Sequence, residues 1–112
     1  MQKPIEFEKL FKVFPKDLYI NFNIAHSYFA SKVFNFSLIK FIKKINSKVA
    51  AVELSCNDSF RDQHLPINSN SKNLNYVKYF KNIPIILEFR NTNFKNLKKS
   101  INILKNYLKK ND

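Results

Sequence analysis

Glycine is absent from this chain of 112 residues, and the functional classes that depend on glycine are excluded with it. Phosphate-binding loops and dinucleotide fingerprints need glycine because a Cβ atom would block the close approach of the backbone to the phosphates. Cys56 is the only cysteine, so the chain offers neither an internal disulfide nor a multi-thiolate metal site. A chain without a cysteine framework is typical of a reducing compartment, and we expect a cytoplasmic protein.

Long hydrophobic runs are also missing. The first eight residues carry Lys3, Glu6 and Glu8 and lack the apolar segment of a signal peptide. The longest uncharged, apolar-rich stretch, residues 18–31, is interrupted by polar side chains and is too short to span a bilayer. The sequence therefore predicts no membrane partner.

Acidic residues are scarce: 8 Asp and Glu stand against 20 Lys and Arg, which gives a net charge of +12. A small basic module that binds RNA or DNA, with an affinity that falls steeply with salt, is therefore one hypothesis for the function. However, Arg61 and Arg90 are the only arginines, and lysine, asparagine, isoleucine and phenylalanine share A- and T-rich codons. We favour the base composition of the gene as the source of the charge, because specific phosphate and base contacts prefer arginine.

Apolar residues are plentiful by contrast. Hydrophobic residues make up 45% of the chain and aromatic residues 15%, including 12 Phe, so we exclude a disordered chain and expect a packed core. The length limits this core to a single domain over residues 1–112. Most aromatic rings fall on the apolar faces of the predicted elements, so we expect them in the core rather than on a surface that stacks nucleic-acid bases.

Period-two and helical spacings alternate along the chain. They predict strands at residues 18–24, 49–54 and 85–89. They predict helices at residues 5–14, 34–48, 74–82 and 94–109, and polar loops at residues 26–32 and 55–71. The second strand is apolar enough to be buried on both faces of a parallel sheet. One helix followed by three βα units predicts an α/β fold with a parallel sheet, right-handed crossovers and two unpaired sheet edges.

Polar side chains follow each predicted strand, at the end where ligands bind in parallel α/β folds. The candidate ligand-binding residues at these strand ends are Asn23, His26, Glu53, Glu88, Arg90 and Asn91. A carboxylate at an apolar strand end needs a partner, and Arg90 lies on the same side of its strand as Glu88. The pair is either part of a substrate-anchoring or acid/base cluster or a structural ion pair, and the residues alone leave both open.

The remaining reactive side chains give weak signals. His26 and His64 are isolated histidines in polar loops, where an imidazole is usually solvated. Cys56 has acidic neighbours, which disfavour a thiolate nucleophile. The histidine, cysteine and acidic residues show no metal-ligand spacing. We predict neither a metal nor a cofactor, and we assign no catalytic residue.

The third predicted strand carries the most distinctive run in the chain. Residues 83–94 read Ile-Pro-Ile-Ile-Leu-Glu-Phe-Arg-Asn-Thr-Asn-Phe, which resembles the strand motif of the YecE-like family (domain of unknown function 72). In that family an apolar strand runs into Glu-Phe-Arg-His-Pro-Ser-Trp, so Glu88 and Arg90 are direct matches. Residues 52–60 are similar to the family's Gln-Leu-Pro-Pro-Ser-Phe strand end, with Glu53 in place of Gln and without the paired prolines.

The first predicted strand extends the resemblance. Residues 7–24 are similar to the family's Phe-x-x-Trp, proline and Phe-x-Phe-x-Val-Lys pattern, with Leu10 in place of Trp and Asn23 in place of Lys. After the third strand, residues 91–94 replace the family's His-Pro-Ser-Trp with Asn-Thr-Asn-Phe. Several side chains of the family motif are therefore absent from the candidate site.

The resemblance implies a particular fold and partner. The YecE-like family forms (β/α)₈ barrels and has no established activity. This chain matches about three βα units from the middle of such a barrel, so the resemblance implies a partial TIM-type (β/α)₈ barrel that is truncated or incomplete. Another chain, or self-association, would then supply the missing strands. Three βα units provide only part of a catalytic rim, so the sequence identifies no reaction.

Overall fold

The computed structural model describes residues 3–57, 61 and 63–111. Its strands are β1 (Ile20–Asn23), β2 (Val49–Leu54) and β3 (Ile85–Leu87). Its α-helices are α1 (Pro4–Val13), α2 (Ile24–Val33), α3 (Leu38–Ile45) and α4 (Phe94–Lys110). Two 3-10 helices are described as well, η1 (Asn46–Lys48) and η2 (Lys72–Tyr79).

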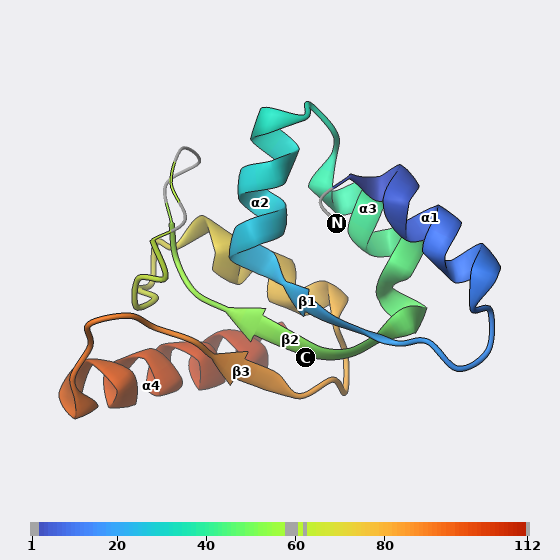
Figure 1. The fold of residues 1–112 in the computed structure, drawn as a ribbon. Helices are drawn as coiled ribbons and strands as arrows, with labels where there is room; N and C mark the ends of the chain where they lie inside the picture. Colours follow the sequence, from blue (N-terminus) through green and yellow to red (C-terminus); the bar gives the residue numbers. More distant parts are fainter. Residues whose placement is uncertain (1–2, 58–60, 62, 112) are drawn as a thin grey trace.

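The three strands form one parallel sheet in the order β1-β2-β3 (Figure 1). Asn23 of β1 lies opposite Glu53 of β2, and Glu53 lies opposite Ile86 of β3. The register between β1 and β2 shifts by one residue next to Ile20. The expected α/β fold with a parallel sheet is confirmed. The described strands form an open sheet, in which β1 and β3 are edge strands.

One face of the sheet is covered by the helices. Phe22, Val52 and Leu54 point to this face and are at most 2% exposed. The ring centroid of Phe22 lies 5.8 Å from that of Phe41 in α3 and 5.2 Å from that of Phe80, which follows η2. Because the apolar residues of the strands and of the helices meet here, this layer between sheet and helices is the hydrophobic core.

The other face of the sheet, which we call the open face, carries side chains that remain partly or fully exposed to solvent. Its members are Asn21, Asn23, Ala51, Glu53, Ile86 and Glu88. Ile86 is 48% exposed although it lies in the middle of a strand. The prediction that the second strand is buried on both faces is therefore wrong. Its larger apolar residues Val52 and Leu54 lie on the helical face, and among the described residues no element buries the opposite face.

The predicted polar loop at residues 26–32 is instead part of helix α2. This helix has no clear polar face, because Ala25, Ala30 and the polar Ser31 are all buried between the sheet and its neighbours. Periodicity alone cannot reveal such a helix. Its start is set locally, since the Asn23 side chain accepts a hydrogen bond from the His26 backbone N–H.

The other boundaries differ less. Ser37 caps α3 through the backbone N–H of Lys40, so this helix begins at Leu38 and not at residue 34. The predicted helix at 74–82 is the 3-10 helix η2, and the predicted helices at 5–14 and 94–109 are confirmed as α1 and α4. None of the helices among the described residues has both the length and the apolar character that crossing a membrane requires.

Candidate functional site

The carboxylate of Glu53 is held by two amide groups of the neighbouring strand. Asn21 Nδ2 donates to Glu53 Oε1 at 2.5 Å, and Asn23 Nδ2 donates to Glu53 Oε2 at 2.8 Å. The parallel register places all three side chains on the open face, one strand apart. These hydrogen bonds explain how an acidic residue is tolerated near the end of an apolar strand. Asn21 is one of the polar residues that the sequence places near the end of the first predicted strand.

Asn23 connects this carboxylate to helix α2. Its Nδ2 donates to Glu53 while its Oδ1 accepts from the backbone N–H of His26 at 3.0 Å. One side chain therefore ends β1, begins α2 and fixes one oxygen of Glu53. The predicted site residues Asn23, His26 and Glu53 are brought together in this way.

The loop after β2 folds back and places His64 at the same edge of the sheet. Cys56 and Leu65 form an isolated antiparallel bridge with two backbone hydrogen bonds of 2.8 Å. The backbone N–H of Arg90 then donates to the carbonyl of His64 at 2.9 Å. His64 has a φ of 49°, in the left-handed region that non-glycine residues seldom adopt. Backbone hydrogen bonds at His64 and at Leu65 therefore fix the position of this imidazole.

His64 is buried and faces Glu88. It is 5% exposed, so the expectation of a solvated imidazole is wrong for this residue. Its Nδ1 lies 3.6 Å from Glu88 Oε2, and its ring meets the ring of His26 edge-on at 5.5 Å between centroids. His26 itself is exposed on the first turn of α2. The imidazole of His64 and the carboxylate of Glu88 therefore face each other at the strand ends, where the half-exposed carboxylate can accept hydrogen bonds from a ligand.

The expected ion pair between Glu88 and Arg90 is not formed. Within the described part of the chain the carboxylate of Glu88 pairs with His64, and Arg90 contributes its backbone N–H instead. The Arg90 side chain is exposed. Asn91 is exposed too and adopts a φ of 49°, which turns the chain from β3 toward α4. Asn side chains tolerate this conformation better than most, so a local backbone role accounts for Asn91.

The side-chain amides of Asn57 and Asn73 are buried and connect the elements next to this edge of the sheet. Asn73 of η2 is 1% exposed, and its Nδ2 donates to the Ser55 carbonyl at 2.8 Å and to Asn57 Oδ1 at 3.0 Å. Asn57 Nδ2 in turn donates to the carbonyl of Ala25 at 3.1 Å. The network ties η2, the end of β2 and the first turn of α2 together. Asn57 is one of the polar residues that follow the second predicted strand, whereas no sequence pattern distinguishes Asn73 from the other asparagines in the chain.

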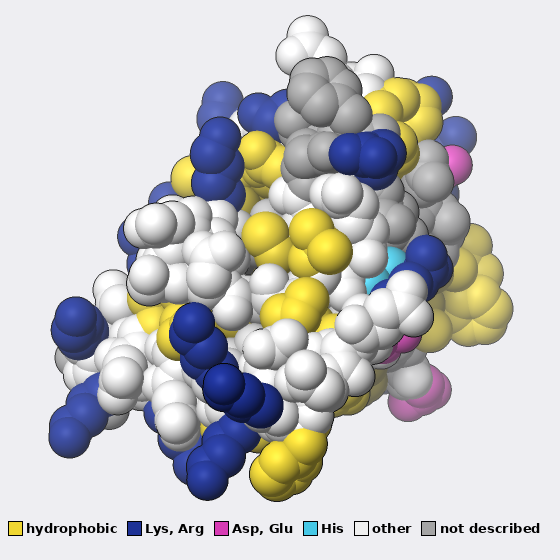
Figure 2. All heavy atoms as spheres, turned by 90° about the vertical axis from the view of Figure 1, so that its left-hand side faces the viewer, with side chains coloured by type: hydrophobic (Ala, Val, Ile, Leu, Met, Phe, Trp, Pro, Cys, Tyr) yellow, Lys and Arg dark blue, Asp and Glu magenta, His cyan; other side chains and the backbone are white. Residues whose placement is uncertain are grey.

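Six polar side chains from the three strand ends thus form one cluster, which we call the strand-end cluster: Asn21, Asn23, His26, Glu53, His64 and Glu88. Figure 2 views the molecule from the side to which the strands point, and a histidine is visible there beside acidic side chains. In the described residues, no three His, Cys, Asp or Glu side chains are grouped closely enough to hold a metal ion. Its carboxylates and asparagine amides provide hydrogen-bond acceptors and donors.

The two asparagines that bind Glu53 are expected to contribute unequally to stability. Asn21→Ala removes an exposed hydrogen bond to a carboxylate and should lower the free energy of unfolding by about 0.5–1 kcal/mol. Asn23→Ala also removes the cap of α2, so about 1.5–3 kcal/mol is expected. In a Glu53→Ala background, Asn21→Ala should become nearly neutral while Asn23→Ala still costs about 1 kcal/mol. Urea denaturation of the single and double variants measures these differences, and equal losses in both backgrounds would contradict the geometry.

Comparisons of the chain with models of known protein families, with curated proteins and with solved structures find no match. The similarity of the three strand segments to the YecE-like family stays a prediction. What the chain does is therefore inferred from its own geometry.

Proposed function

We propose that the chain is part of a YecE-like parallel barrel and binds a small ligand, rich in hydroxyl or amine groups, at the carboxyl ends of its strands. The observation that carries this proposal is the strand-end cluster. Glu53, His64 and Glu88 come from three separate parts of the sequence and meet at the edge where parallel α/β proteins bind ligands. A few polar groups that converge at this position are typical of a binding site.

The chemistry of the cluster favours hydrogen-bond donors in the ligand. Each carboxylate oxygen has two lone pairs, and each oxygen of Glu53 uses one of them for an asparagine amide. The Glu88 side chain is 52% exposed, so its carboxylate is accessible to a ligand. Hydroxyl and ammonium groups satisfy such acceptors, whereas an anionic ligand would be repelled by two carboxylates.

The sheet itself supports association with a second copy of the chain. The order β1-β2-β3 leaves β1 and β3 as the two unpaired edges of the sheet, and the open face exposes Ile86 of β3. A two-fold axis parallel to the strands places β3 of each copy beside β1 of the other, in parallel. Both unpaired edges and the open face are then covered. We propose this pairing as the way in which the missing strands are supplied.

Titration of the isotope-labelled chain with two probes, glucose and putrescine, tests the ligand proposal. We expect amide chemical-shift changes confined to the ends of β1, β2 and β3 and to the first turn of α2. The double variant Glu53→Gln, Glu88→Gln should abolish them, because it removes both carboxylates. Glu8→Gln is the matched control: it removes one acidic charge whose partner is Lys44, away from the cluster. Shift changes that survive in the double variant, or that vanish equally in the control, would contradict the proposal.

A further inference from the structure

A second surface, formed by α2, α3 and η2, combines lysines with tyrosines. A hollow of about 390 Å³ lies between α2, α3 and η2. Its principal lining residues are Tyr28, Lys32, Lys72, Tyr76, Lys78 and Tyr79. We call this surface the tyrosine–lysine groove. None of these lining residues is a member of the strand-end cluster.

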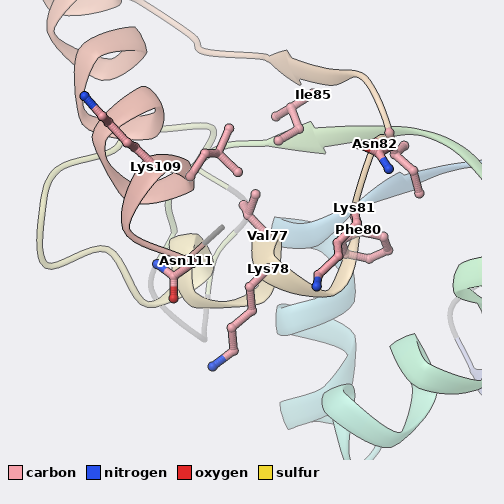
Figure 3. A pocket seen from close by; sticks show the side chains of 10 residues that line it. Val77, Lys78, Phe80, Lys81, Asn82, Ile85, Lys109 and Asn111 are labelled. Atoms are coloured by element: carbon pink, nitrogen blue, oxygen red, sulfur yellow. The ribbon is translucent and has the colours of Figure 1, made fainter.

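The groove continues into two neighbouring hollows. One of about 530 Å³ is lined by Lys43, Lys78 and Lys81, and one of about 510 Å³ by Lys78, Lys81 and Lys109. Lys78 lines all three, so the hollows adjoin one another on the helical surface, and we refer to them together as the path. Figure 3 shows the last hollow, with Lys78 and Lys81 on its η2 side and Lys109 on its α4 side. None of the described residues that line the path is Asp or Glu.

The aromatic rings lie directly among these charges. Lys43 Nζ and Lys78 Nζ lie 6.0 Å and 5.5 Å from the ring centroid of Tyr79, and Lys32 Nζ lies 5.4 Å from that of Tyr28. Tyr76 and Tyr79 are half-buried, so each ring is fixed by packing and still reaches solvent. Burial, together with the nearby hydroxyls of Tyr28 and Tyr79, raises the pKa of Tyr76, so its phenol stays neutral at neutral pH.

We propose that the tyrosine–lysine groove binds single-stranded nucleic acid, with lysines on the phosphates and tyrosine rings against the bases. Proteins that bind single strands without sequence preference combine a basic channel with aromatic stacking platforms. A duplex or a flat membrane surface cannot bring its apolar groups into a concave path, whereas the bases of a single strand can enter it. Lysine suits this use because it contacts phosphate as a point charge and needs no bidentate geometry. The proposal is independent of the strand-end cluster.

Fluorescence anisotropy with a labelled oligothymidylate of about 12 nucleotides, a length within typical site sizes, tests the proposal. The triple variant Lys32→Gln, Lys72→Gln, Lys78→Gln should bind at least about tenfold more weakly at low salt. The slope of log affinity against log salt should fall in magnitude by about 2, since each lost phosphate contact on a single strand contributes about 0.7.

The matched control removes the same charge elsewhere. Lys98, Lys99 and Lys105 are exposed on α4 and line none of the hollows. The triple Gln variant at these three positions should retain nearly full affinity. Equal losses in the two triple variants would overturn the proposal, because binding would then follow net charge alone. No binding at low salt would overturn it as well.

The tyrosine contribution is measured separately. Tyr79→Ala should weaken binding about five- to hundredfold, whereas Tyr79→Phe keeps the ring and the affinity. Circular dichroism checks that both variants are folded. If Tyr79→Ala does not fold, the lysine variants still test the proposal. An abasic oligonucleotide of the same length should bind more weakly than oligothymidylate. Equal affinity for the abasic strand, or equally groove-dependent binding to phosphatidylserine vesicles, would overturn single-strand recognition.

Discussion

Phe22→Ala is expected to lower the free energy of unfolding by about 3–5 kcal/mol, the largest effect of any single truncation considered for this chain. Phe22 is 2% exposed, and its ring contacts the rings of Phe41 and Phe80. Truncation leaves a cavity between β1, α3 and the end of η2, which the neighbouring rings cannot fill without leaving their own positions. Most of the stability of a domain of this size would be lost.

Phe94→Ala is the matched control for this change. Phe94 is 79% exposed at the first position of α4, so the same truncation should change the free energy of unfolding by no more than about 0.5 kcal/mol. Urea denaturation followed by circular dichroism measures both variants. Similar losses at the two positions would show that Phe22 is not at the centre of the core.

Asn73→Ala is expected to cost about 2–4 kcal/mol, the second-largest effect. It removes both donations of the Asn73 amide and leaves the Ser55 carbonyl and Asn57 Oδ1 buried without this donor. The loop that carries His64 starts at this network. Amide shifts of the strand-end cluster should therefore change together with stability.

Asn75→Ala in the same helix η2 provides the comparison. The Asn75 side chain is exposed, and the hydrogen bond from the Tyr107 hydroxyl goes to its backbone carbonyl. A change within about 0.5 kcal/mol is expected. If Asn73→Ala proves as mild as Asn75→Ala, the buried amide network does not hold the strand ends together.

The strands and the amphipathic helices could be predicted from the sequence because their burial is periodic. Residues 49–54 are a strand with the expected bounds, and α4 differs from its predicted range by one residue. Helix α2 escaped prediction because it is buried on several sides and its start depends on the Asn23 cap. A helix whose position is set by tertiary contacts leaves no amphipathic signal.

The candidate site could be predicted only in part. The rule that ligands bind at the carboxyl ends of parallel strands located Glu53, Glu88 and Asn23 correctly at one edge of the sheet. The alternation of side chains along the strand suggested Arg90 as the partner of Glu88, but Glu88 faces His64, whose position depends on the Cys56–Leu65 bridge within a long loop. Loop closure of this kind involves backbone groups, which every residue carries, and so it leaves no trace in the pattern of side chains.

The measurement that tests the proposed pairing of open sheets most directly is sedimentation of the chain over a range of concentrations, at low and high salt, combined with amide hydrogen exchange. We expect a discrete dimer that persists at high salt, because backbone pairing and apolar contacts are not screened. Protection of the β1 and β3 amides should rise with protein concentration. A monomer at all concentrations, with the amides of both edge strands fully protected, would contradict the pairing and leave the three-stranded sheet self-sufficient.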